Sequence, residues 1–275
     1  MHFRNRKNQS GQAVLIVLLS LSVVLIVILY ILSRSITDIS LSSKEEDSLR
    51  AFSAAEAGIE RALVIGNNIP STGLNDATFN ATVTGFAQGS TSAVFPIPLK
   101  SGESAIFWFI GHNADGTLGC TTESCFTGNQ ARFCWGDDNT TDNPAVEISI
   151  YYKVGSEYRI HRKMLDPLGG RTSNNDAPGI NCQINGENFE YNDTYSFAGL
   201  SNLQFATVKI LYNDTIAHKV AIDTLGTGNL PSQGVKVNSN GSFADANRSI
   251  EVYQLHPEIP PIFANVLYSG SGITK

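Results

Sequence analysis

The chain has 275 residues, a formal net charge of −6 and a charged fraction of 16%. This acidic balance disfavours binding to nucleic acid through bulk charge, because a phosphate backbone attracts clustered Lys and Arg. Without its basic first residues the charge falls to −9, since Arg4, Arg6 and Lys7 contribute +3 to the −6.

A basic leader and a long apolar segment open the chain. Residues 1–11 contain no acid, and the twenty residues from Ala13 to Leu32 contain no charge. A helix of that length rises about 1.5 Å per residue and spans the roughly 30 Å hydrocarbon core of a bilayer. The basic leader predicts that residues 1–11 lie in the cytoplasm and everything after Leu32 lies outside. No small-x-small site follows, so we do not expect an ordinary cleaved secretory signal.

The helix is predicted to continue beyond the membrane. No Pro occurs between Met1 and Ile69, and the apolar residues recur at spacings of 3, 3, 4 and 4, the stripe of an amphipathic helix: Leu49, Phe52, Ala55, Ile59 and Leu63. The run from Gly66 to Pro70 predicts the end of the helix. We therefore predict one rod of about 80 Å, with a transmembrane half at 12–32 and an amphipathic half at 33–66.

Two short motifs on this helix resemble a known family. Residues 7–17 (KNQSGQAVLIV) resemble the class III signal of type IV prepilins, in which a dedicated peptidase cuts after a Gly that precedes the apolar helix. Residues 52–62 (FSAAEAGIERA) resemble the A-x-x-A-E-A-G-[ILM] segment of PilX-like minor pilins. The resemblance covers roughly residues 5–65.

The resemblance implies specific processing and packing. A prepilin peptidase would cleave between Gly11 and Gln12, and the stretch Ala13–Leu32 would pack with the helices of other pilin subunits in the filament core. The packing residues expected on the outer half of the helix are Leu49, Phe52, Ala55, Glu56, Ile59 and Leu63. Of these, Leu49, Phe52, Ile59 and Leu63 are expected to face the chain's own head.

One position departs from the family pattern. Major pilins carry a Glu five residues into the processed chain, which is thought to pair with the N-terminal amine of a neighbouring subunit, and here that place is Ile16. A buried carboxylate is costly unless it is paired, so it acts as an assembly register that Ile16 cannot supply. The departure favours a minor subunit near a filament tip. The alternative is another registering contact, such as Ser20 or Ser22.

The remainder of the chain is predicted to be a β-rich head. About 205 residues follow Pro70, enough for one sizeable domain or two small ones. They are rich in Asn, Gly, Thr, Ser and Asp and break into short runs of β-branched and aromatic residues. We predict an α+β fold, with an antiparallel head at 70–275 that forms a sandwich or a sheet packed on the outer half of the helix.

Several runs are predicted as strands. A strand is expected at 104–110, and the runs 145–154 and 157–164 flank Gly155-Ser156 as a hairpin. The runs 203–212 and 215–224, joined at Asn213-Asp214, suggest a second hairpin. A last alternating strand is expected at 249–255.

The four cysteines all follow the membrane segment. An even number in an exported domain predicts disulfides. We expect one local bond among Cys120, Cys125 and Cys134, with Cys182 bonded to the third. Free thiols and a metal site are the alternatives, and the C-x4-C-x8-C spacing is unlike that of zinc sites.

Other candidate sites are weak. The loop 137–143 and the stretch 113–116 could offer oxygen ligands to Ca²⁺, but Asp and Asn in surface turns bond their own backbone, so we expect no metal and no cofactor. The basic run 158–163 fits a half-solvated strand better than a nucleic-acid patch. The five His are scattered and no catalytic motif occurs, so no enzyme activity is expected.

These features predict a minor pilin-like structural subunit of a type IV pilus or related filament, active in assembly or priming and in adhesion or DNA uptake. Its expected partners are other pilin subunits, the prepilin peptidase and the membrane, with no specific nucleic acid. The helix would anchor it in the cytoplasmic membrane, with the head extracytoplasmic and at the cell surface after assembly. The alternatives are a type II secretion pseudopilin and a single-pass surface protein that binds an extracellular ligand.

Overall fold

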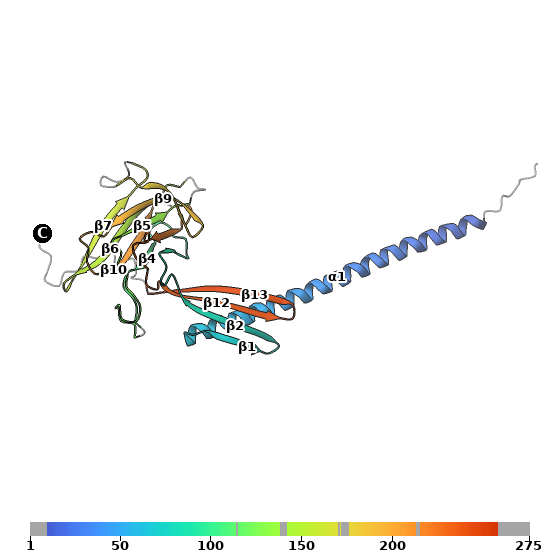
Figure 1. The fold of residues 1–275 in the computed structure, drawn as a ribbon. Helices are drawn as coiled ribbons and strands as arrows, with labels where there is room; N and C mark the ends of the chain where they lie inside the picture. The colour runs from blue at the N-terminus through green and yellow to red at the C-terminus, as the bar shows by residue number, and fades with distance from the viewer. Residues whose placement is uncertain are drawn as a thin grey trace, which may run out of the picture. The chain divides into compact units, whose positions relative to one another are not determined.

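The computed structural model describes residues 10–113, 115–137, 142–169, 171, 176–212 and 215–257 (Figure 1). The chain divides into two compact units. The first unit contains Met1–Thr82 and Asn238–Glu251, and the second contains Val83–Val237 and Val252–Lys275. The predicted head at 70–275 therefore contributes residues to both units.

One long helix dominates the first unit. Helix α1 runs from Ser10 to Ile65 without a break, because its sequence contains no Pro and its only interior Gly after the first turn is Gly58. It ends where Gly66 adopts a φ of +71° and donates its N–H to the carbonyl of Ala62 at 2.8 Å, the left-handed termination that Gly favours. The stretch from Ala13 is apolar and long enough to cross a membrane.

A four-stranded sheet packs on the end of this helix. Its order is β1-β2-β12-β13, with β1 at Ile69–Leu74, β2 at Ala77–Gly85, β12 at Gly234–Phe243 and β13 at Ala246–Leu255. Alternate residues of β2 are buried, namely Ala77, Phe79 and Ala81, so one face of the sheet lies against the helix and the other faces solvent. Figure 1 shows these strands alongside the C-terminal part of α1.

The second unit is an antiparallel β-sandwich. One sheet has the order β4-β10-β6-β7 and the other the order β3-β11-β5-β9-β8. The strand bounds are β3 Ser92–Val94, β4 Ser104–Trp108, β5 Gln130–Trp135, β6 Ala145–Val154, β7 Glu157–Leu165, β8 Gly179–Ile184, β9 Glu187–Ser196, β10 Leu203–Leu211 and β11 Val220–Asp223. The inner faces meet in one core, in which Phe107 of the first sheet contacts Phe133 of the second at 6.3 Å between ring centroids.

These elements confirm the α+β fold and both predicted forms of the head, a sandwich and a sheet on the helix. The hairpin of β6 and β7 is confirmed, with Val154 opposite Glu157. The second predicted hairpin is wrong: β10 pairs with β4 and β6, whereas β11 pairs with β3 and β5. Residues 213–214, where the turn was expected, lie outside the described residues. β10 and β11 belong to different sheets of the sandwich, so β11 does not return along β10.

Candidate functional site

The outer half of α1 leaves three of its large apolar residues exposed. Leu49, Phe52 and Leu63 are 62%, 43% and 36% exposed, and Glu56 is exposed as well. These three apolar residues, which were expected to face the head, are thus not buried against it, although Leu49 lines a hollow between α1 and the β1–β2 turn. Ala55 and Ile59, from the same expected set, are buried at 0% and 8% exposure.

Small residues occupy the face of α1 that contacts the sheet: Ala51, Ala54, Ala55, Gly58 and Ala62. A Cβ on Gly58 would lie 2.1 Å from Ser239 Oγ, and a Cβ on Gly241 would lie 2.0 Å from the carbonyl oxygen of Ala51. The helix and the sheet thus approach more closely than side chains of Leu or Phe would allow. Leu49, Phe52 and Leu63 lie outside this close contact and stay exposed.

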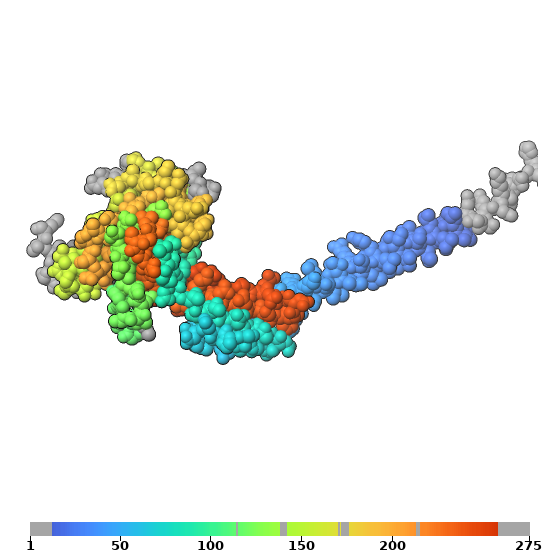
Figure 2. All heavy atoms as spheres, in the orientation of Figure 1, coloured from blue at the N-terminus to red at the C-terminus, as the bar shows by residue number. Residues whose placement is uncertain are grey.

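The membrane-side half of α1 is uncovered. Every described side chain from Ala13 to Glu46 is exposed, and in Figure 2 the outermost blue part of the helix has no other segment drawn against it. Ile16, at the place of the family's registering Glu, is 65% exposed. The hydroxyls of Ser20 and Ser22 donate to the carbonyls of Val17 and Leu19 at 2.9 and 2.8 Å, so both are satisfied within the helix.

The expected processing site lies where α1 begins. Gly11 and Gln12 are in its first turns. Leader residues 1–9 lie outside the described residues.

An apolar groove adjoins Leu49 on the outer half of α1. A hollow of about 320 Å³ lies between α1 and the turn of β1 and β2. Leu49, Leu74 and Phe243 contribute to its lining, and Glu46 and Asp76 lie at it as well. Arg50 lies 4.9 Å above the Phe243 ring and bonds to Glu46 at 2.6 Å, so its charge is already engaged.

Both disulfides lie in the second unit. Cys120 is bonded to Cys125 and Cys134 to Cys182, across separations of 5 and 48 residues. This confirms the expected pattern of one local bond with Cys182 bonded to the remaining cysteine. The second bond joins β5 to β8, on either side of β9 in the sheet order.

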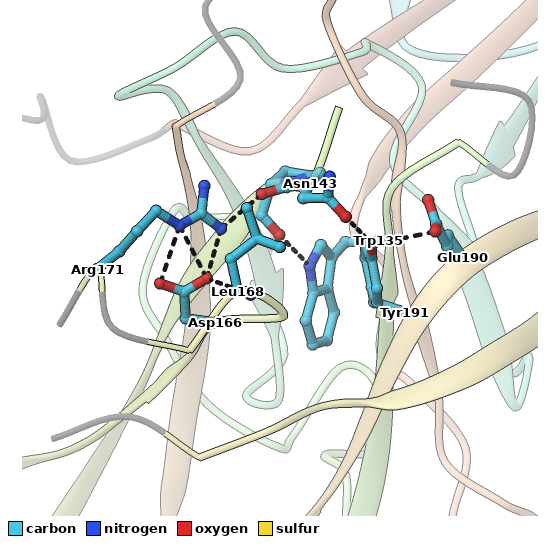
Figure 3. A network of polar contacts seen from close by, with 8 residues as sticks. Trp135, Asn143, Asp166, Leu168, Arg171, Glu190 and Tyr191 are labelled. Carbon is cyan, nitrogen blue, oxygen red and sulfur yellow. Dashed lines mark hydrogen bonds and ion pairs between the residues drawn. The ribbon is translucent and has the colours of Figure 1, made fainter. Parts of the chain in front are cut away.

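A polar network ties the loops at one end of the sandwich (Figure 3). The carboxylate of Asp166 is fully buried and forms an ion pair with Arg171. Arg171 also donates to the backbone carbonyl of Asn143 at 2.7 Å. The N–H of Leu168 donates to Asp166 at 2.9 Å. A buried carboxylate is stable only with such partners.

The network extends through Asn143 to aromatic residues. The hydroxyl of Tyr191 lies 2.7 Å from Asn143 Oδ1 and 3.0 Å from Glu190 Oε1. Burial, and then the hydrogen bond to Glu190, raise the pKa of Tyr191 to about 12, so the hydroxyl keeps its proton and donates. Trp135 Nε1 donates to the carbonyl of Pro144 at 2.9 Å. These bonds hold loops in place, and the network offers no activated nucleophile.

Three histidines are held in their neutral form. His112 and His256 stack with ring centroids 3.6 Å apart and planes 9° apart. Burial, reinforced by the charge of His256, lowers the pKa of His112 to about 4, and burial also lowers the pKa of His256. Burial likewise lowers the pKa of His218, whose Nδ1 accepts the N–H of Asp137 at 3.2 Å.

The two weak calcium candidates find no support in the part of the chain that the structure describes. Residues 138–141 lie outside it, and Asp142 accepts a hydrogen bond from Thr215 at 2.6 Å. Asp115 is engaged by Thr117 at 2.6 Å. No group of three His, Cys, Asp or Glu among the described residues could hold a metal ion.

The basic run on β7 is neutralised by nearby acids. Arg159 pairs with Glu157 at 2.9 Å, Arg162 lies 4.0 Å from Glu147, and Lys163 contacts Asp193 at 3.0 Å. The strand is exposed from Glu157 to Arg162, which agrees with a solvated strand.

Sequence reasoning missed the network of Asp166, Arg171, Asn143 and Tyr191. These residues come from separate loops and a strand, and no motif joins them.

Comparison of the chain with protein-family models, with curated proteins and with solved structures finds no match.

Proposed function

We propose that this chain is a minor pilin-like structural subunit of a type IV pilus or a related filament, and that it acts in assembly or priming through its long helix. The observation that carries the proposal is α1 itself. It continues unbroken from an apolar stretch long enough to cross a membrane into a half that keeps large apolar residues exposed.

A lone membrane anchor would not need large apolar residues exposed on this outer half. Exposed large apolar side chains on one side of a helix are typical of a surface that packs with another element. Here Leu49, Phe52 and Leu63 stay exposed, while small residues of α1 form the close contact with the sheet. Packing of neighbouring helices would remove these side chains from water.

The location follows from the same elements. The apolar stretch from Ala13 would be held in the cytoplasmic membrane, with the basic leader inside and both units outside. Two disulfides suit an oxidising extracytoplasmic compartment. In assembled filaments the chain would reach the cell surface, with adhesion or DNA uptake as further roles.

Processing at Gly11 tests the proposal. Mass spectrometry of the native protein should give an N-terminus at Gln12 or at its cyclised form, and a Gly11→Leu variant should keep its leader. An intact leader in the native protein, in cells whose other prepilins are cleaved, would leave a single-pass surface protein and overturn the proposal.

A further inference from the structure

We propose that the exposed stripe of α1 binds a helix of a different subunit, one that presents apolar residues flanked by Lys or Arg, and not a second copy of this chain. The inference rests on the proposed function and names the chemistry of the partner. The stripe comprises Leu41, Glu45, Leu49, Phe52, Glu56, Glu60 and Leu63.

The stripe is one continuous surface. With 3.6 residues per turn, its members fall on one side of the helix, next to the buried Ile59 and away from the buried Ala54 and Gly58. Its apolar members are exposed by between 36% and 65%. Its three glutamates are exposed too.

No basic side chain of the described residues pairs with the three glutamates of the stripe. Within the described part of the chain, Glu45, Glu56 and Glu60 form no ion pair, unlike Glu46, which pairs with Arg50. Glu56 and Glu60 are four residues apart, so like charges are neighbours on the helix surface, which is unfavourable in isolation. A partner that covers the apolar residues would also partly desolvate these carboxylates, and it must supply positive charge.

A second copy packed stripe against stripe cannot supply that charge. Two identical helices packed in parallel without a shift would place Glu45, Glu56 and Glu60 against the same residues. The stripe's helix face carries one base, Arg34, two turns before Leu41, and any shift brings it to one glutamate only. Charge complementarity therefore disfavours contact between two copies of the stripe and favours a basic amphipathic helix.

The test uses the full chain in nanodiscs of zwitterionic phosphatidylcholine and two synthetic amphipathic helical peptides. The peptides share one Leu/Ile stripe, and one carries Lys beside it where the other carries Glu. Binding is followed by fluorescence anisotropy of the labelled peptide. We expect the Lys peptide to bind and to weaken with added salt, and the Glu peptide not to bind.

Two variants with the same loss of charge locate the site. In Glu56→Gln/Glu60→Gln the dissociation constant of the Lys peptide should rise about tenfold, which corresponds to about 1.4 kcal/mol. The control Glu157→Gln/Asp245→Asn, at exposed acids off the stripe, should bind like the parent. Equal binding of both peptides, or equal loss in both variants, would overturn the inference. So would crosslinked dimers of the parent chain that Phe52→Asp abolishes.

Failure of the inference and of the proposed function can be told apart. A chain that is processed at Gly11 but binds both peptides alike keeps its function and loses this partner. A chain that keeps its leader loses the filament role, whatever it does with the peptides.

Discussion

A single methyl group at Gly241 should separate the sheet of the first unit from α1. The Cβ in Gly241→Ala would lie 2.0 Å from the carbonyl oxygen of Ala51 and 2.4 Å from the backbone N of Ala55. Both obstacles are helix backbone and cannot rotate away. Reaching an ordinary contact at 3.4 Å needs a displacement of about 1.4 Å, which would loosen the contact with the buried alanines of α1.

Overpacking of a tight contact costs about 1–3 kcal/mol, and we expect about 3 kcal/mol here because two backbone atoms obstruct the new methyl. Hydrogen exchange of the full chain in detergent, read at the amides of β2 between Ala77 and Thr82, should show protection reduced about a hundredfold. The matched control is Gly73→Ala in β1, where an added Cβ meets nothing within 4 Å. If Gly241→Ala exchanges no faster than Gly73→Ala, the close helix–sheet contact is refuted.

Three further expectations concern the second unit, and each is followed by denaturant unfolding with tryptophan fluorescence. Replacing the pair Cys134/Cys182 by Ala should lower the free energy of unfolding by about 4 kcal/mol, and replacing Cys120/Cys125 should lower it by about 2 kcal/mol. The difference arises because the closed loops span 48 and 5 residues, and equal losses would contradict this expectation. Arg171→Met should cost about 3–5 kcal/mol by leaving the buried Asp166 unpaired, and a loss below about 1 kcal/mol would show that the pair is not buried. The imidazole of His112 binds a proton near pH 6.5 in the unfolded chain but only near pH 4 in the folded chain. The free energy of unfolding is therefore highest above pH 6.5 and decreases as the pH drops toward 4. His112→Phe should flatten that fall, and an unchanged pH profile would show that His112 is not buried.

The helix could be predicted almost completely from the sequence, but the side of it that contacts the sheet could not. Hydrophobic periodicity identifies an apolar stripe through Leu49, Phe52, Ala55, Ile59 and Leu63, of which only Ala55 and Ile59 are buried. The rest of the buried face consists of small residues such as Ala54, Gly58 and Ala62, because small residues let two backbones approach. That choice depends on the partner surface, including Gly241, which lies far away in the sequence.

The β-rich part shows the same division between local and non-local information. The turn at Gly155-Ser156 fixes the β6–β7 hairpin, because the two strands follow each other directly. The similar turn signal at residues 213–214 could not show that β10 and β11 belong to different sheets. The ion pair of Asp166 with Arg171 is local, but its links to Asn143 and Tyr191 arise only after the loops have packed.

Purified filaments from cells that express an epitope-tagged full chain test the central claim most directly. Immunogold labelling should place the tag on filaments at low density and near their ends, because Ile16 lacks the registering carboxylate and the stripe of α1 disfavours contacts between copies. Phe52→Asp should remove the tag from the filament fraction while leaving the chain in the membrane. Filaments that form normally without any tagged chain, with all of it remaining in the membrane, would contradict the filament role, and dense labelling along the shaft would contradict a minor subunit.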